Sequence, residues 1–129
     1  MKKLIIIIGG FVAFLVLGVL ALYFWTDIVV KQNIALAQQK YPGKAENALI
    51  AYLLDSTNSP YNRTHIAVWT LGQINSEKAI PVLKMFYYGD PDGKNLSGNQ
   101  KVILDQNEIY KALNAKKVNW LPLHARLKR

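Results

Sequence analysis

Apolar residues recur at helical spacing in the middle of the chain. Ala67, Leu71 and Ile74 fall on one face of an α-helix, which predicts an amphipathic helix with that face in a core. Gly72 lies near the end of the pattern, and Asn75-Ser76 interrupts it. These residues predict that the helix ends in a short turn.

A second helix is predicted directly after this turn, from Ser76 to Gly89. Ser76 can cap its first turn, and Pro81 lies near enough to the start to remove only one backbone hydrogen bond. Apolar residues occupy most positions, namely Ala79, Ile80, Val82, Leu83, Phe86 and Tyr87. We therefore expect a helical hairpin whose second helix is buried between partners on two sides.

The longest apolar segment, Leu4 to Trp25, lies at the N-terminus and contains no charged residue. A helix of this length spans ~33 Å, enough to cross a hydrocarbon core of ~30 Å. Tyr23-Phe24-Trp25 closes the segment with residues common at membrane interfaces. The alternative is a signal peptide cleaved after Val19-Leu20-Ala21, but the apolar segment is longer than usual for that role. We favour an uncleaved transmembrane anchor over residues 1–25.

The sequence also predicts the orientation of the anchor and the helix that follows it. Lys2 and Lys3 favour a cytoplasmic N-terminus, with the domain outside the cytoplasm. Residues 26–41 contain no helix breaker and should form an amphipathic stem that ends at Tyr41-Pro42-Gly43. Its apolar face is formed by Val30, Ile34, Ala37 and Tyr41.

Residues 42–129 are predicted to form a domain of about four helices. One is Ala45 to Leu54, and the helix of the hairpin begins after Ser59, a natural N-cap that precedes Pro60. Asp105 and Glu108 have the spacing of a capping box that opens the last helix, which runs to about Lys116. The sequence thus indicates an all-α protein.

Three motifs stand in order in the hairpin: Arg63-x-x-x-Ala67, Leu71-Gly72-x-Ile74 and Ala79-Ile80-Pro81-x-Leu83. Together they resemble the HEAT repeat, especially its short bacterial form. The resemblance covers roughly 25 residues and implies a short α–α superhelical stack that binds something, without indicating what it binds. It also implies that Arg63 ties neighbouring helices together, and Asp55 and Asp90 are the acids we expect it to reach. With the apolar segment and the orientation favoured by Lys2 and Lys3, the bacterial form of the repeat leads us to expect a bacterial inner membrane, with the domain in the periplasm if the cell has two membranes.

A second copy of the repeat is only partial. Glu46-x-Ala48-Leu49 matches Glu77-x-Ala79-Ile80 at roughly the distance of one repeat. The last helix has Glu108 where the family has Arg or Lys, and it lacks the Leu-Gly end. Two repeats are few for such a stack, so we expect the stem and the C-terminal tail to cap its ends.

Candidate chemistry in the sequence is sparse. The chain of 129 residues has no cysteine, which excludes disulfides, thiol catalysis and cysteine-bound metals. His65 and His124 are the two histidines, and we expect both to be structural. The segment from Asp90 to Asn95 fits a turn better than a calcium loop, because Lys94 occupies a ligand position. We expect no enzyme activity, metal or cofactor.

The C-terminal tail, residues 116–129, carries the candidate interaction residues. They are Lys116, Lys117, Trp120, Arg126, Lys128 and Arg129. With a net charge of +8, this basic tail could contact anionic lipid or a partner. The other interpretation is that Trp120 and Leu123 dock across the last helices as a cap, while the charges stay in water.

Taken together, these features predict a membrane-tethered protein–protein interaction module, an adaptor or accessory subunit that uses a HEAT-like surface. One alternative is a membrane-surface or nucleic-acid binder that works through the basic tail, although nucleic acid fits the sequence less well. Another is an accessory or small-molecule-binding subunit of an extracytoplasmic enzyme, which would need a deep pocket.

Overall fold

The computed structural model describes residues 1–89, 104–118 and 124–128, and every regular element in these ranges is helical. The elements are α1 Lys2–Lys40, α2 Ala45–Leu54, α3 Pro60–Asn62, the π-helix η1 Arg63–Val68, α4 Trp69–Gln73, α5 Ile80–Met85, α6 Gln106–Leu113, α7 Ala115–Val118 and the 3-10 helix η2 Ala125–Lys128. The predicted all-α class is confirmed, and α2 has the predicted bounds.

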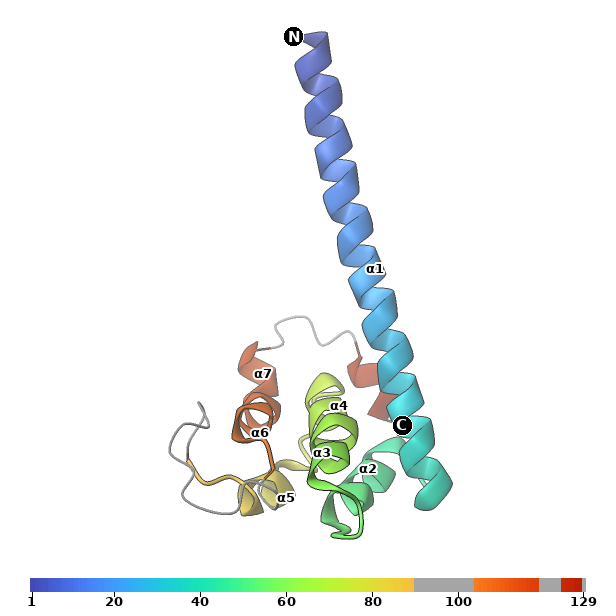
Figure 1. Cartoon of the computed structure of the whole chain (residues 1–129), viewed down its shortest axis with the longest axis vertical. Helices are drawn as coiled ribbons and strands as arrows, with labels where there is room; N and C mark the ends of the chain where they lie inside the picture. Colours follow the sequence, from blue (N-terminus) through green and yellow to red (C-terminus); the bar gives the residue numbers. More distant parts are fainter. Residues whose placement is uncertain (90–103, 119–123, 129) are drawn as a thin grey trace.

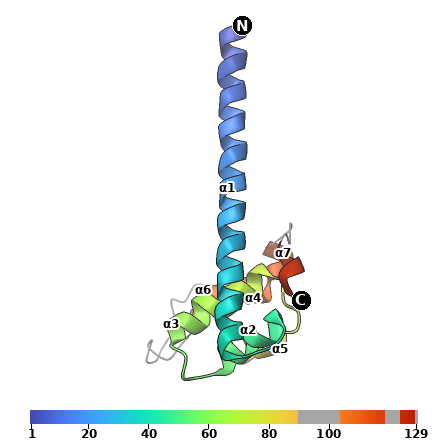
Figure 2. The ribbon, with the colours of Figure 1, turned by 90° about the vertical axis from the view of Figure 1, so that its right-hand side faces the viewer.

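Helix α1 is unbroken from Lys2 to Lys40 and dominates the shape of the molecule (Figure 1). Its N-terminal part stands clear of the other elements, which gather around its C-terminal end in both views (Figure 2). The most apolar window of α1 has a mean hydropathy of 3.0, and none of that window is buried in the protein. This helix is therefore long and apolar enough to cross a membrane.

The C-terminal part of α1 belongs to the core of the domain. Val30, Ile34 and Ala37, on the predicted apolar face, are buried against the other helices. Asn33, beside them, is also buried and donates through Nδ2 to the hydroxyl of Thr70 at 2.9 Å. The segment expected to be a stem is thus also one of the helices around which the domain packs.

The hairpin helix packs as its pattern predicts. Its residues follow one another in α3, η1 and α4, and Ser59 caps the start through a hydrogen bond from the Asn62 N–H at 3.1 Å. The apolar face formed by Ala67, Leu71 and Ile74 is buried. Ala79 and Leu83, which follow the turn, are buried as well. These side chains meet Leu49 and Leu53 of α2 and Ile109 of α6 in one core.

The turn after α4 closes in the way that Asn75-Ser76 predicts. Asn75 has a φ of 54°, a left-handed conformation that asparagine tolerates better than most residues. The Ser76 N–H donates to the Leu71 carbonyl at 3.0 Å, and the Asn75 N–H donates to the Gly72 carbonyl at 3.1 Å. This is a Schellman motif, which satisfies the carbonyl groups left free at the helix end.

The prediction of a long second helix from Ser76 to Gly89 is wrong. Helix α5 covers only Ile80–Met85, and Met85 and Tyr88 are 69% and 66% exposed. The helix stops because Gln106 binds the backbone that follows it. The Gln106 side chain donates to the Phe86 carbonyl at 2.9 Å and accepts from the Tyr88 N–H at 2.7 Å. The second helix of the hairpin is therefore buried on one side only, chiefly through Leu83.

The capping box predicted for the last helix is only half formed. Asp105 accepts from the backbone N–H groups of Asn107 and Glu108, as an N-cap should. Glu108 does not return to the Asp105 N–H, which donates instead to the Thr64 hydroxyl at 3.3 Å. Helix α6 then ends at Leu113, and the short helix α7 follows, so the predicted single helix to Lys116 is divided in two.

Arg63 does tie helices together, but not through Asp55 as predicted. Its Nε donates to the Leu53 carbonyl at 2.7 Å, and its guanidinium lies 5.1 Å from the centre of the Phe86 ring. The Leu53 carbonyl is one of the last four of α2, which have no partner within their own helix. Asp55 instead pairs with Lys40 at 3.1 Å, and Asp90 lies outside the described residues.

Candidate functional site

Helices α4 and α6 approach each other closely at Gly72. A Cβ built on Gly72 would lie 3.2 Å from Cα and 3.3 Å from Cβ of Ala112. Because glycine has no side chain, the two helices can meet here without a clash. Gly72 was recognised in the sequence only as part of the Leu-Gly helix end, and its packing role depends on a residue 40 positions away in the chain.

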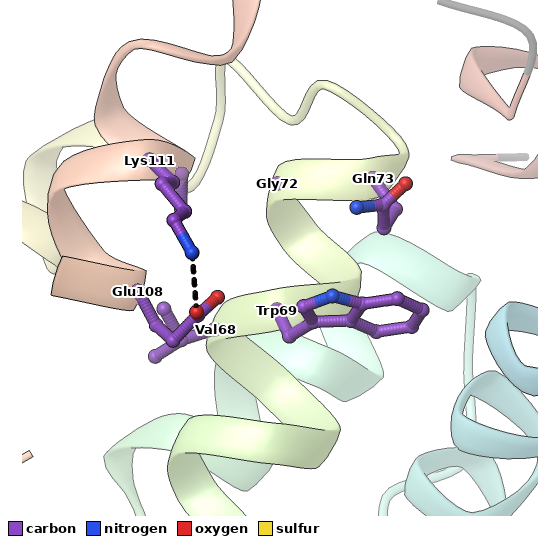
Figure 3. A pocket seen from close by; sticks show the side chains of 7 residues that line it. Val68, Trp69, Gly72, Gln73, Glu108 and Lys111 are labelled. Carbon is purple, nitrogen blue, oxygen red and sulfur yellow. Dashed lines mark hydrogen bonds and ion pairs between the residues drawn. The ribbon is translucent and has the colours of Figure 1, made fainter. Parts of the chain in front are cut away.

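A groove with a volume of about 170 Å³ lies along this helix contact. Figure 3 shows Gly72 between two pairs of side chains, with Trp69 and Gln73 from α4 on one side and Glu108 and Lys111 from α6 on the other. The full lining is Val68, Trp69, Gly72, Gln73, Glu108, Lys111 and Ala112. We call this feature the α4–α6 groove.

The chemistry of the α4–α6 groove is mixed. Val68 is buried, Trp69 is half-buried, and Lys111 pairs with Glu108 at 2.8 Å on the rim. The groove volume is below the ~300 Å³ at which pockets for small molecules begin. Its size and lining suit one apolar side chain of a protein partner, with the charged pair beside it.

A second cluster lies where α1 enters the domain. Asp27 accepts from Arg126 of η2 at 2.7 Å and pairs with Lys31 one turn along α1, also at 2.7 Å. Arg126 also donates to the Tyr23 hydroxyl at 3.0 Å. The hydrogen bond from Lys31, together with the charges of Lys31 and Arg126, holds the pKa of Asp27 below its ordinary value. The C-terminal turn is thus fastened to α1 by charge.

His124 also packs against α1 in this cluster and is structural, as expected. It is 7% exposed, and its ring stacks on Tyr23 with the ring centres 5.3 Å apart. Its Nε2 is 3.7 Å from Asp27 Oδ1 and makes no hydrogen bond within the described part of the chain. Burial lowers the pKa of His124, so the ring is neutral at neutral pH.

The prediction that the tail lies across the final helix pair is wrong for residues 124–128. These residues contact α2, Arg126 binds Tyr23 and Asp27 of α1, and Leu127 packs against the core. Arg126 pairs with Asp27, a carboxylate far away in the chain, and this contact holds η2 beside α1. Trp120, Leu123 and Arg129 lie outside the described residues.

The other predicted interaction residues come to the same end of the domain. Lys116 pairs with Glu77, Lys117 is exposed, and Lys128 is half-buried. Their elements, α7 and η2, lie at the end of the domain that faces the exposed part of α1 (Figure 1, Figure 2). We call this region the anchor-side end. Within the described ranges, no three His, Asp or Glu side chains lie close enough together to hold a metal ion.

Comparison with known proteins adds no relative. No family model, curated protein or solved structure matches the chain. The resemblance of the hairpin to the HEAT repeat therefore stays a prediction.

Proposed function

We propose that the protein is a membrane-tethered protein–protein interaction module, an adaptor or accessory subunit that binds through a HEAT-like helical surface. The proposal rests on α1, because one helix has both an exposed apolar part and a part that belongs to the core of the domain. Its N-terminal part is apolar on all sides and exposed, while Val30, Ile34 and Ala37 of the same unbroken helix are core residues. An exposed helix of this length and composition is suited to a bilayer, which supports the proposed tether.

The α4–α6 groove is the binding surface that fits this function best. Tryptophan is enriched among the residues that dominate binding energy, and the half-buried Trp69 stands at the groove's edge. The Lys111–Glu108 pair supplies polar groups that can fix the orientation of a partner. The partner that fits is a protein segment that places an apolar side chain over Gly72 between these two walls.

The proposed setting is a bacterial inner membrane, with the N-terminus in the cytoplasm and the domain outside. Lys2 and Lys3 support this orientation, because positive residues near the end of a span stay in the cytoplasm. Lys31 and the basic residues of the anchor-side end favour the opposite orientation, but only weakly. Long domains cross the membrane largely regardless of their charge.

Site-specific crosslinking in intact cells tests the binding surface. A photoreactive residue replaces Gln73 in the groove or, as a matched control, the exposed Gln39 of α1. We expect a discrete adduct with a second protein at position 73 and none at position 39. Trp69→Ala should abolish the adduct without removing the protein from the membrane. The same adducts at both positions, or adducts insensitive to Trp69→Ala, would contradict the proposed surface.

A further inference from the structure

The hydrogen bonds of Arg126 fix its position along α1. The apolar segment of α1 ends at Trp25, and Asp27 follows ~3 Å further along a helix that rises ~1.5 Å per residue. Arg126 bridges the Tyr23 hydroxyl and the Asp27 carboxylate, so its guanidinium lies at the level where the apolar segment ends. The headgroup layer on each side of a bilayer is ~5–8 Å thick. In a bilayer spanned by this apolar segment, Arg126 would therefore lie at headgroup level.

Positive charge exceeds negative charge around this position. The basic residues on α1, α7 and η2 at the anchor-side end are Lys31, Lys116, Lys117, Arg126 and Lys128. Within the described ranges, the acids in contact with them are Asp27 and Glu77. Asp27 is shared by two cations, and its side chain is only 11% exposed, whereas those of Lys31 and Arg126 are 57% and 52% exposed. The surface that the anchor-side end presents is thus basic.

We propose that the anchor-side end binds the headgroups of anionic phospholipids. The phosphate lies against the exposed sides of Arg126 and Lys31, and Lys117 and Lys128 add attraction from the neighbouring helices. This inference rests on the part of the proposed function in which α1 spans the membrane, because only then does this end face a bilayer. The consequence is that lipid charge, as well as the anchor, sets the tilt and height of the α4–α6 groove above the membrane.

The test uses the full chain in vesicles of phosphatidylcholine that contain a trace of a spin-labelled lipid. The spin resonance spectrum separates lipids restrained by the protein from free ones, and it is compared for labelled phosphatidylglycerol and labelled phosphatidylcholine. The variant Lys117→Gln/Lys128→Gln removes two charges without touching the Asp27 cluster. The matched control, Lys44→Gln/Lys84→Gln, removes two exposed lysines, one on α5 at the opposite end and one just beyond the end of α1. Lys2 and Lys3 are retained throughout, so their attraction cancels.

We expect wild type and control to prefer phosphatidylglycerol, and the preference to fall by about fivefold for each lysine removed from the anchor-side end. Raising the salt concentration to ~1 M should remove most of the preference. Equal restraint of both lipids, or an equal fall in the control variant, would overturn the headgroup site. If neither lipid is restrained, α1 is not in the bilayer, and the proposed membrane tether fails as well.

Discussion

Gly72 leaves α4 without a side chain at the position where α6 presents Ala112, and a Cβ at Gly72 would lie only 3.2 Å from the Ala112 Cα. The neighbouring atom belongs to a helix backbone, so it cannot rotate away as the end of a flexible side chain could. The α4–α6 groove exists at its present width because of this contact.

Gly72→Val should therefore destabilise the domain. The added methyl groups force α4 and α6 apart, and overpacking of this kind costs ~1–3 kcal/mol. Thermal unfolding of the full chain in detergent, followed by circular dichroism, measures the effect. Gly10→Val is the control, because nothing lies within 4 Å of a Cβ at that position. An unchanged melting temperature for Gly72→Val would show that the helix contact is looser than described.

The hydrogen bond between Asn33 and Thr70 should hold α1 in the core. Asn33→Ala leaves the Thr70 hydroxyl buried without this donor, which should cost ~1–3 kcal/mol. Gln32→Ala, at the exposed neighbouring position, should change stability by less than ~0.5 kcal/mol. A double-mutant cycle of Asn33→Ala with Thr70→Val isolates the pair. Additive effects would mean that the two side chains do not act together.

Asp55 should make the domain sensitive to strong acid. Hydrogen bonds from Thr57 and Tyr41, followed by that from Lys40, hold the pKa of Asp55 far below its ordinary value. A carboxyl whose folded pKa is lowered stabilises the fold above its unfolded pKa of ~3.9 and loses this effect as the pH falls further. Stability should thus fall steadily below pH ~4, and less steeply in Asp55→Asn. Parallel pH profiles for the two proteins would refute this role.

His124 should add a separate sensitivity at mild acid. Burial lowers its folded pKa, so the unfolded chain takes up a proton first as the pH falls below ~6.5. The docking of η2 on α1 should weaken below this pH, although nearby Asp27 opposes the effect. His124→Phe keeps a ring against Tyr23 and should flatten the profile between pH ~6.5 and ~5. Amide hydrogen exchange of residues 124–128 measures it, and equal pH dependence in both proteins would contradict it.

The sequence predicted the elements whose signals are local. Helix α2 contains no breaker, so its bounds could be predicted. Asn75-Ser76 interrupts the apolar pattern, so the end of α4 could be predicted as well. The buried face of α1 followed from a single periodicity. These features depend on neighbours within one or two helical turns.

The sequence could not show contacts between side chains and distant backbone. Gln106 ends α5 by binding the backbone of Phe86 and Tyr88, and nothing near α5 signals this. An acid was expected for Arg63 because charge is visible in a sequence, whereas the free carbonyl of Leu53 is not. The α4–α6 groove was missed for the same reason, since it needs Gly72 and Ala112 to meet.

We propose that one unbroken helix, α1, is both the membrane anchor and a core helix of the domain. The most direct measurement is the intact mass of the protein recovered from washed membranes. We expect the whole chain, near 14.6 kDa, and we expect that carbonate does not extract it from the membrane. A chain that lacks the residues up to Ala21 and is found in the soluble fraction would contradict it, because the apolar segment would then be a cleaved signal peptide.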